Sequence, residues 1–206
     1  MSWLARMEIS SDSALRERIV DSYAWHKKSW DCFPGNPDGE RDFLIRVDSM
    51  AKAFRLWVLS VRKPVCPAWC PPETFVVKEL ASSFLEHRFY CFDLRANPTK
   101  RDAQQGNRRA LSKPDDLRAW LHRKGEMGGF RIVEEKPLEI GPMVKGFFCK
   151  EENRDQKECQ SLHGGVQFRG VLEVTDVETF KKTYQQGIGS GKAFGYGLLL
   201  LAPATL

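Results

Sequence analysis

The spacing of apolar residues along the chain predicts short strands and helices in a regular order. In the first half, the predicted elements are a strand at 3–9, a helix at 14–33, strands at 43–47 and 54–61, a short helix at 73–81 and a strand at 88–95. Alternation of apolar and polar positions indicates the strands, and helical spacing of apolar positions indicates the helices. Proline and glycine at 34–37 end the first helix.

The second half repeats this order of elements. After an exposed, basic loop at 97–112, the pattern predicts a helix at 114–124, strands at 130–133, 146–149 and 166–174, a helix at 176–184 and a final strand at 193–201. Each half fits the order strand, helix, strand, strand, helix, strand of a ferredoxin-like, or RRM-like, domain. We therefore predict an α+β fold with two tandem βαββαβ domains, one at 1–95 and one at 96–206.

The composition is typical of a globular protein. The 206 residues are 42% apolar and 29% charged, which provides enough apolar material for a core. No apolar run approaches the roughly 20 residues of a membrane-spanning helix. The first residues also lack the basic segment and apolar stretch of a signal peptide. We therefore expect a cytoplasmic protein that makes no membrane contact.

The net charge of +5 is modest, but the basic residues are concentrated in one part of the chain. From Arg95 to Arg131 there are ten Lys or Arg residues and only four Asp or Glu residues. Such a local excess favours a partner that is rich in phosphate. A solvated helix face with its flanking loops would also explain the excess, so charge alone does not decide between the two.

The six cysteines form no recognisable metal motif. Cys66 and Cys70 are separated by three residues, and no second close pair completes a zinc site. His87 and His163 lack the spacing of zinc ligands to these cysteines. A disulfide framework is typical of small secreted proteins rather than of a chain of this length without a secretory signal. We therefore expect free or buried thiols and no bound metal.

A glycine-rich segment near the C-terminus predicts a loop that contacts phosphates. Gly187 to Gly197 holds five glycines in eleven residues, with Lys192 among them. Glycine lets the backbone approach a ligand closely, so successive N–H groups can surround phosphate oxygens while the lysine adds charge. A nucleotide-binding P-loop is disfavoured because Ala193 replaces its hydroxyl residue and Gln186 replaces its first glycine. Because a tight helix-to-strand connection needs only one or two glycines, we predict contact with an RNA backbone.

A tyrosine and a histidine with helical spacing are candidates for proton transfer. Tyr23 and His26 are three residues apart, so on a helix their side chains lie on the same side. Histidine titrates near neutral pH. RNA carries its own nucleophile in the 2′-hydroxyl, so a base, an acid and charge stabilisation suffice to cleave it without a metal. A single helical histidine is more often structural, and we interpret the other three in this way: His87, His122 and His163.

Several segments together resemble the CasE family, whose members are CRISPR RNA-processing endoribonucleases of type I-E CRISPR systems. They occur in the family's order over nearly the whole chain: Tyr23 to His26 with Trp30 and Phe33-Pro34, Arg41 to Leu44, Leu94 to Arg101, Ala119 to Leu121, Phe168 to Leu172, and Gln186 to Leu199 with Ala202-Pro203. The Arg-Ala-Asn-Pro segment at 95–98 and the glycine-rich segment are specific in combination.

The resemblance implies two ferredoxin-like domains that recognise the stem-loop of a CRISPR repeat. It implies cleavage at the 3′ base of that hairpin, without a metal or cofactor, to leave a 2′,3′-cyclic phosphate and a 5′-hydroxyl. The protein would then stay on the mature CRISPR RNA and join the Cascade complex. By position, His26 would be the general acid or base, and Tyr23 its companion at the scissile phosphate.

The resemblance and the basic excess together predict a set of RNA contacts. These are Lys27, Lys28, Arg95, Lys100, Arg101, Arg108, Arg109, Gly187, Gly189, Gly191, Lys192, Gly195 and Gly197. The charged loop at 150–163 and the proline-rich stretch at 66–72 match no motif of the family. Two other functions stay open. One is a catalytically silent subunit that binds an RNA hairpin, which the presence of both Tyr23 and His26 disfavours; the other is a nucleotide-phosphate enzyme, which Ala193 disfavours.

Overall fold

The structure is a computed structural model that describes residues 2–35, 41–101, 107–148 and 161–205. The chain divides into two compact units. The first comprises Met1–Ala81, Phe147–Leu162 and Ala193–Gly195, and the second comprises Ser82–Gly146, His163–Lys192 and Tyr196–Leu206. In the described ranges, no helix has the length and apolar character needed to cross a membrane.

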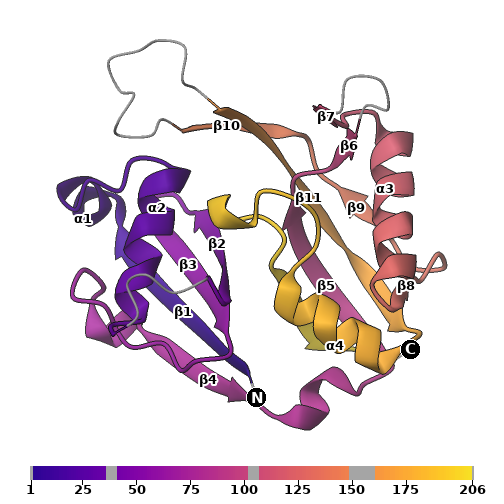
Figure 1. Ribbon diagram of the computed structural model, residues 1–206, viewed down its shortest axis with the longest axis horizontal. Coiled ribbons are helices and arrows are strands. Elements are labelled where there is room, and N and C mark those ends of the chain that lie inside the picture. The colour runs from indigo at the N-terminus through magenta and orange to yellow at the C-terminus, as the bar shows by residue number, and fades with distance from the viewer. Residues whose placement is uncertain (1, 36–40, 102–106, 149–160, 206) are drawn as a thin grey trace. The chain divides into compact units, whose positions relative to one another are not determined.

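The first unit is built on a four-stranded antiparallel sheet (Figure 1). Its elements are β1 (Ser2–Ser10), α1 (Ser11–Arg16), α2 (Ser22–Ser29), β2 (Phe43–Ser49), β3 (Ala53–Ser60) and β4 (Val76–Leu80), with 3-10 turns at Trp30–Cys32 and Pro72–Thr74. The sheet order is β2-β3-β1-β4, so the first and third strands are central. This order is ferredoxin-like, with the second helix of the motif reduced to the turn at Pro72–Thr74.

Helices α1 and α2 cover one face of this sheet, because apolar residues alternate along its strands. Ala5 and Ile9 of β1 are at most 2% exposed and belong to the core beneath the helices. The rings of Trp25, on α2, and Trp69 meet edge-on, with centroids 6.1 Å apart. Trp69 Nε1 also donates a hydrogen bond to the Lys28 carbonyl at 3.3 Å. These contacts hold α2 in a defined orientation on the unit.

The single helix predicted at 14–33 is wrong, because the structure divides it into α1, α2 and a 3-10 turn. Helix α1 ends at Arg16, and Arg18 has a positive φ of 58°, a left-handed conformation that interrupts a helix. Asp21 then starts α2, because its side chain accepts a hydrogen bond from the Ala24 N–H at 2.7 Å and caps the new helix. Apolar spacing continues across the break, so periodicity alone does not reveal it.

The short helix predicted at 73–81 is also wrong, since most of this segment forms β4. The strand pairs with β1 in antiparallel register, with Val77 opposite Ala5. Lys, Glu and Leu in the segment favour a helix, but only weakly. Pairing with the open edge of a sheet overrides that local preference.

The second unit repeats the arrangement. Its sheet contains β5 (Phe89–Ala96), β8 (Phe130–Ile132), β9 (Glu139–Ile140), β10 (Val144–Phe148), β11 (Ser161–Val174) and β12 (Leu199–Pro203), and its helices are α3 (Pro114–Met127) and α4 (Val177–Gln186). A separate hairpin is formed by β6 (Thr99–Arg101) and β7 (Arg108–Ala110), and 3-10 turns lie at Ser82–Leu85 and Lys192–Phe194. The main order is β10-β11-β5-β12, which is again ferredoxin-like.

The division between the units differs from the predicted boundary between residues 95 and 96. The strand predicted at 88–95 as the last of the first domain is β5, which lies between β11 and β12 in the second sheet. Its Tyr90 is fully buried and packs on Phe180 of α4, with ring centroids 5.8 Å apart. The first unit takes its fourth strand from β4 instead, so the units separate between Ala81 and Ser82.

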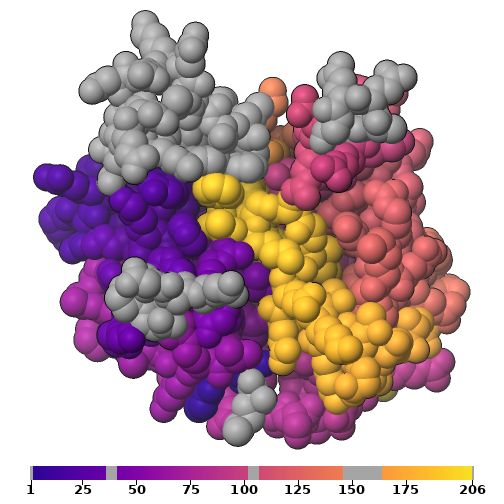
Figure 2. Space-filling model, viewed as in Figure 1, coloured from indigo at the N-terminus to yellow at the C-terminus, as the bar shows by residue number. Residues whose placement is uncertain are grey.

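Two further predictions differ in their limits, and a third lies mostly outside the described residues. The loop predicted at 97–112 contains the β6–β7 hairpin, and the last strand begins at Leu199 rather than at residue 193. Of the predicted charged loop at 150–163, residues 150–160 lie outside the described residues. Residues 161–163 belong to β11, so the strand predicted to begin at 166 begins at Ser161. In Figure 2, atoms of α4 and the segment after it, orange to yellow, are open to solvent on the face in view. Residues 187–197, the glycine-rich segment, are nevertheless all half-buried or buried.

Candidate functional site

Tyr23 and His26 lie on α2 of the first unit, three residues apart and therefore on the same side of the helix. Both residues are half-buried. Trp25 and Ser29 of the same helix are buried, and Ser29 Oγ donates a hydrogen bond to the His26 carbonyl at 2.7 Å. Helix α2 thus holds the two candidate residues at the boundary between the core and the surface.

The surroundings of His26 favour its neutral form. Burial lowers the pKa of the imidazole, and the positive charge of Arg41 lowers the pKa further. Among the described residues, the buried Nδ1 atom of His26 has no hydrogen-bond partner. A neutral imidazole can accept a proton, so this environment suits a general base near neutral pH.

The two lysines that follow His26 have different surroundings. Lys27 is exposed, and its ammonium lies 5.3 Å from the centre of the Tyr23 ring, a cation–π distance. Lys28 Nζ forms an ion pair with Glu17 at 2.7 Å. The charge of Lys28 is therefore matched by a carboxylate of the same unit, whereas Lys27 places a cation beside Tyr23. Of these two predicted RNA contacts, the geometry favours Lys27.

Four of the predicted basic contacts lie on the β6–β7 hairpin of the second unit. In its register, Lys100 is opposite Arg109 and Arg101 is opposite Arg108, and all four residues are exposed. Successive residues of a strand point to opposite faces, so each face of the hairpin presents one pair of cations. Like charges directly opposite on paired strands destabilise a sheet. The hairpin therefore favours binding of anions on both faces.

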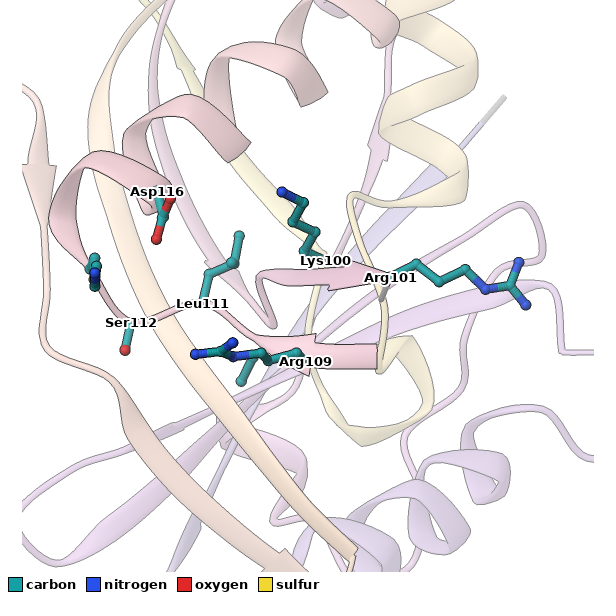
Figure 3. A pocket seen from close by; sticks show the side chains of 8 residues that line it. Lys100, Arg101, Arg109, Leu111, Ser112 and Asp116 are labelled. Carbon is teal, nitrogen blue, oxygen red and sulfur yellow. The ribbon is translucent and has the colours of Figure 1, made fainter. Parts of the chain in front are cut away.

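A pocket beside the hairpin extends this basic surface toward α3 (Figure 3). Its volume is about 500 Å³, and its lining includes Lys100, Arg101, Arg109, Lys113 and Asp116. Asp116, in the first turn of α3, is the one carboxylate among the described lining residues. Figure 3 shows Arg101 extending away from Arg109. The described lining thus holds four cations and one carboxylate, an excess of positive charge that favours a phosphate group.

Two motifs that are far apart in the sequence meet in the second unit. The Gly197 N–H donates a hydrogen bond to the Arg95 carbonyl at 2.8 Å, and Asn97 forms a β-bridge with Ser190. The guanidinium of Arg95 also lies 5.8 Å from the centre of the Tyr196 ring. The Arg-Ala-Asn-Pro segment and the glycine-rich loop are therefore in direct contact, which gives a physical reason for their occurrence together.

The fold of the protein itself requires glycines in this loop. Positive φ angles occur at all five: Gly187, Gly189, Gly191, Gly195 and Gly197. A Cβ atom on Gly197 would lie 2.6 Å from the Ile188 carbonyl oxygen, and one on Gly189 would lie 3.0 Å from the Trp120 ring. The premise that such a connection needs only one or two glycines is therefore wrong. RNA contact stays a prediction for these glycines and for Lys192.

Arg41 belongs to the site, although the sequence suggested no role for it. The residue is half-buried just before β2, and its charge acts on His26. In the sequence, its one signal is its place in the segment from Arg41 to Leu44 that resembles the CasE family. No local pattern brings residue 41 to residue 26, because their proximity depends on the packing of β2 against α2.

Among the cysteines of the first unit, Cys32 has a thiol that strongly resists deprotonation. Burial, followed by the negative charge of Asp31, raises the pKa of the Cys32 thiol to about 12. Cys70 is also buried, whereas Cys66 is exposed. Within the described ranges, no three His, Cys, Asp or Glu side chains are grouped so that they could hold a metal ion. Cys32 and Cys70 thus serve as apolar packing groups rather than as reactive thiolates.

The fold defines the general class of this protein, which has two ferredoxin-like domains in tandem. A family model described as CRISPR associated protein matches residues 2–203. The CRISPR-associated endoribonuclease Cse3 of Thermus thermophilus is 32% identical over 213 residues, which cover 98% of this chain and 100% of that protein. The CRISPR system Cascade subunit CasE of Escherichia coli is 32% identical over 200 residues, which cover 89% of this chain and 92% of that protein.

The chain belongs to the CasE family of CRISPR-associated proteins. A solved structure of Thermus thermophilus Cse3 bound to an RNA representing a pre-cleavage complex has a TM-score of 0.80 to this chain at 29% identity, and the match covers 98% of this chain and 99% of that one. The predicted family and the predicted tandem ferredoxin-like fold are both confirmed.

Proposed function

We propose that this chain is a metal-independent endoribonuclease that cleaves CRISPR precursor RNA at the 3′ base of the repeat hairpin. The observation that carries the proposal is His26, a half-buried imidazole three residues after Tyr23 on α2, whose pKa is lowered by burial and by the charge of Arg41. Membership of the CasE family supports the same activity, since the Thermus thermophilus relative is named an endoribonuclease.

RNA supplies the nucleophile for this reaction. The 2′-hydroxyl gives its proton to a base and its oxygen attacks the adjacent phosphorus, while the bond from phosphorus to the 5′-oxygen breaks and that oxygen takes up a proton. The products are a 2′,3′-cyclic phosphate and a 5′-hydroxyl, and general acid–base catalysis is sufficient for both proton transfers. His26 acts as the general acid or base, and the Tyr23 hydroxyl orients the phosphate beside it.

The basic surface of the second unit binds the RNA in this proposal. Lys100, Arg101, Arg108 and Arg109 hold phosphates of the hairpin, because their like-charged pairs need anions between them. Arg95 and the glycine-rich loop form a second contact, since they touch each other directly. The first unit contributes the proton transfer and one further cation, Lys27.

The cleaved RNA remains bound, and the protein joins other subunits of a type I-E Cascade complex. The name of the Escherichia coli relative, a Cascade subunit, supports this assembly. A cytoplasmic location fits this proposal, because bacteria such as those of the two relatives make and process RNA in the cytoplasm.

A labelled type I-E repeat hairpin, incubated with the protein in excess EDTA, tests the proposed function. The wild-type protein should cleave the hairpin at the 3′ base of its stem and leave a cyclic phosphate. His26→Ala should still bind the hairpin but should cleave it about 10²- to 10⁴-fold more slowly, the usual contribution of a general acid–base group. His87→Ala, which removes an exposed histidine of the second unit, is the control and should cleave as the wild type does.

Unimpaired cleavage by His26→Ala would contradict the assignment of that residue. A requirement for magnesium would contradict the metal-independent mechanism. A wild-type protein that binds the hairpin without cutting it would instead support the catalytically silent RNA-binding subunit.

A further inference from the structure

The proposed reaction develops negative charge on the scissile phosphate, and no residue has yet been assigned to stabilise it. As the 2′-oxygen attacks phosphorus, negative charge builds up on the non-bridging phosphate oxygens. Lys28 is already paired with Glu17 at 2.7 Å. We propose that Arg41 is a further catalytic residue, whose guanidinium contacts a non-bridging oxygen of the scissile phosphate beside His26 and stabilises this charge. The inference rests on the proposed function, because it concerns the same reaction.

Packing within the first unit brings Arg41 to α2. Phe43, two residues later on β2, is 3% exposed. The centroid of its ring lies 4.9 Å from that of Trp30, which directly follows α2, and 4.7 Å from that of Phe33, which ends the 3-10 turn after it. The aromatic contacts fix the start of β2 against the end of α2. The core therefore holds Arg41 close enough to His26 for its charge to act on the imidazole.

The guanidinium of Arg41 has an unsatisfied donor. Its Nη1 atom is buried and, within the described residues, has no hydrogen-bond partner. The neighbouring Asp42 is occupied elsewhere, because its two carboxylate oxygens accept hydrogen bonds from Arg62 at 2.6 and 2.7 Å. Burial lowers the pKa of Arg41, and no described carboxylate offsets that effect. A half-buried cation without an anion is unfavourable, and a phosphate beside the guanidinium would supply the missing negative charge.

The Arg41 guanidinium and the His26 imidazole repel each other when both are charged, whereas a phosphate attracts both. A guanidinium beside an imidazole favours the neutral base before RNA binds, because two positive charges would repel. When His26 then takes the proton of the 2′-hydroxyl, the negative charge that develops on the phosphate attracts both cations. The planar fork of N–H groups on arginine also matches two phosphate oxygens, whereas lysine offers only a point charge. Geometry and charge therefore both favour arginine at position 41.

The test compares cleavage with binding. Single-turnover cleavage of a synthetic type I-E repeat hairpin in EDTA is measured beside binding of the same hairpin with a 2′-deoxy nucleotide at the cleavage site, which lacks the nucleophile. Arg41→Gln should slow cleavage by about 10²- to 10³-fold, as loss of one donor to a developing oxyanion does, and should bind the deoxy hairpin nearly as tightly as the wild type. Arg41→Lys should recover part of the rate.

Arg55→Gln is the matched control. It removes an arginine of the same unit whose charge is already balanced by Glu8 at 2.9 Å, and it should cleave at the wild-type rate. Thermal melting shows whether each variant is folded. A titration of His26 by NMR in the free protein adds an independent readout. In Arg41→Gln the pKa of His26 should rise, because a nearby positive charge is lost, but it should stay below 6.5 because burial remains.

Wild-type cleavage by a folded Arg41→Gln variant would overturn the inference. So would a loss of deoxy-hairpin binding as large as the loss of cleavage, which would make Arg41 a general binding residue, or an equal loss of cleavage in Arg55→Gln. In each of these cases the proposed function stands, provided that the wild type cleaves and His26→Ala does not. A wild-type protein that fails to cleave the hairpin would defeat both.

Discussion

Gly197 offers a direct test of how the glycine-rich loop is built. Its φ angle is 89°, and an added Cβ atom would lie 2.6 Å from the Ile188 carbonyl oxygen and 3.2 Å from the Ile188 nitrogen. The surrounding backbone is held in place by two hydrogen bonds. The Ile188 N–H donates to the Gly197 carbonyl at 2.9 Å, and the Gly197 N–H donates to the Arg95 carbonyl at 2.8 Å. Gly197→Ala therefore forces the backbone, rather than a flexible side chain, to move.

The expected destabilisation has two parts. A left-handed conformation costs a residue with a Cβ atom about 1–2 kcal/mol, and an overpacked contact adds about 1–3 kcal/mol. Gly197→Ala should therefore lower the free energy of unfolding by about 2–5 kcal/mol and the melting temperature by roughly 4–20 °C. Gly35 is the matched control, because its φ angle is 99° but no described atom lies within 4 Å of the Cβ atom it would gain. Gly35→Ala should show the conformational cost alone.

Urea denaturation followed by circular dichroism, with hairpin binding measured on the same samples, distinguishes the roles of this glycine. Equal destabilisation by Gly197→Ala and Gly35→Ala would refute the argument from close approach to Ile188. A Gly197→Ala variant that unfolds like the wild type but no longer binds the hairpin would show that the glycine serves the ligand rather than the fold.

Two further predictions concern charged residues and thiols. Replacement of Lys100 or Arg109 by alanine should weaken hairpin binding and reduce the slope of log K against log salt by about one; an unchanged slope in a salt series would show that the residue does not touch phosphate. Exposed Cys66 and Cys91 should react rapidly with a thiol reagent at mildly alkaline pH. Cys32, with its pKa near 12, should react only after unfolding. Rapid labelling of Cys32, located by mass spectrometry, would contradict its burial.

The order of the elements and the family could be predicted from the sequence because both depend on local signals. Alternating apolar positions mark most of the strands, and the spacing of Tyr23 and His26 places them on one side of a helix. The assignment of strands to sheets could not be predicted in the same way. Val76 to Leu80 becomes a strand because β1 offers it an edge, and β5 joins the second unit because β11 and β12 lie beside it. Such pairing depends on segments that are distant in the sequence.

The candidate site shows the same distinction between what the sequence predicts and what the tertiary structure decides. Residue type and spacing marked Tyr23 and His26 as candidates, and the resemblance to the CasE family together with the basic excess marked Lys100, Arg101, Arg108 and Arg109. Only the tertiary structure decided which charges are already matched. Glu17 neutralises Lys28 and Arg62 occupies Asp42, so Arg41 is left without a carboxylate among the described residues. Side-chain pairing follows distances set by packing, and distances in space cannot be read from neighbours in the chain.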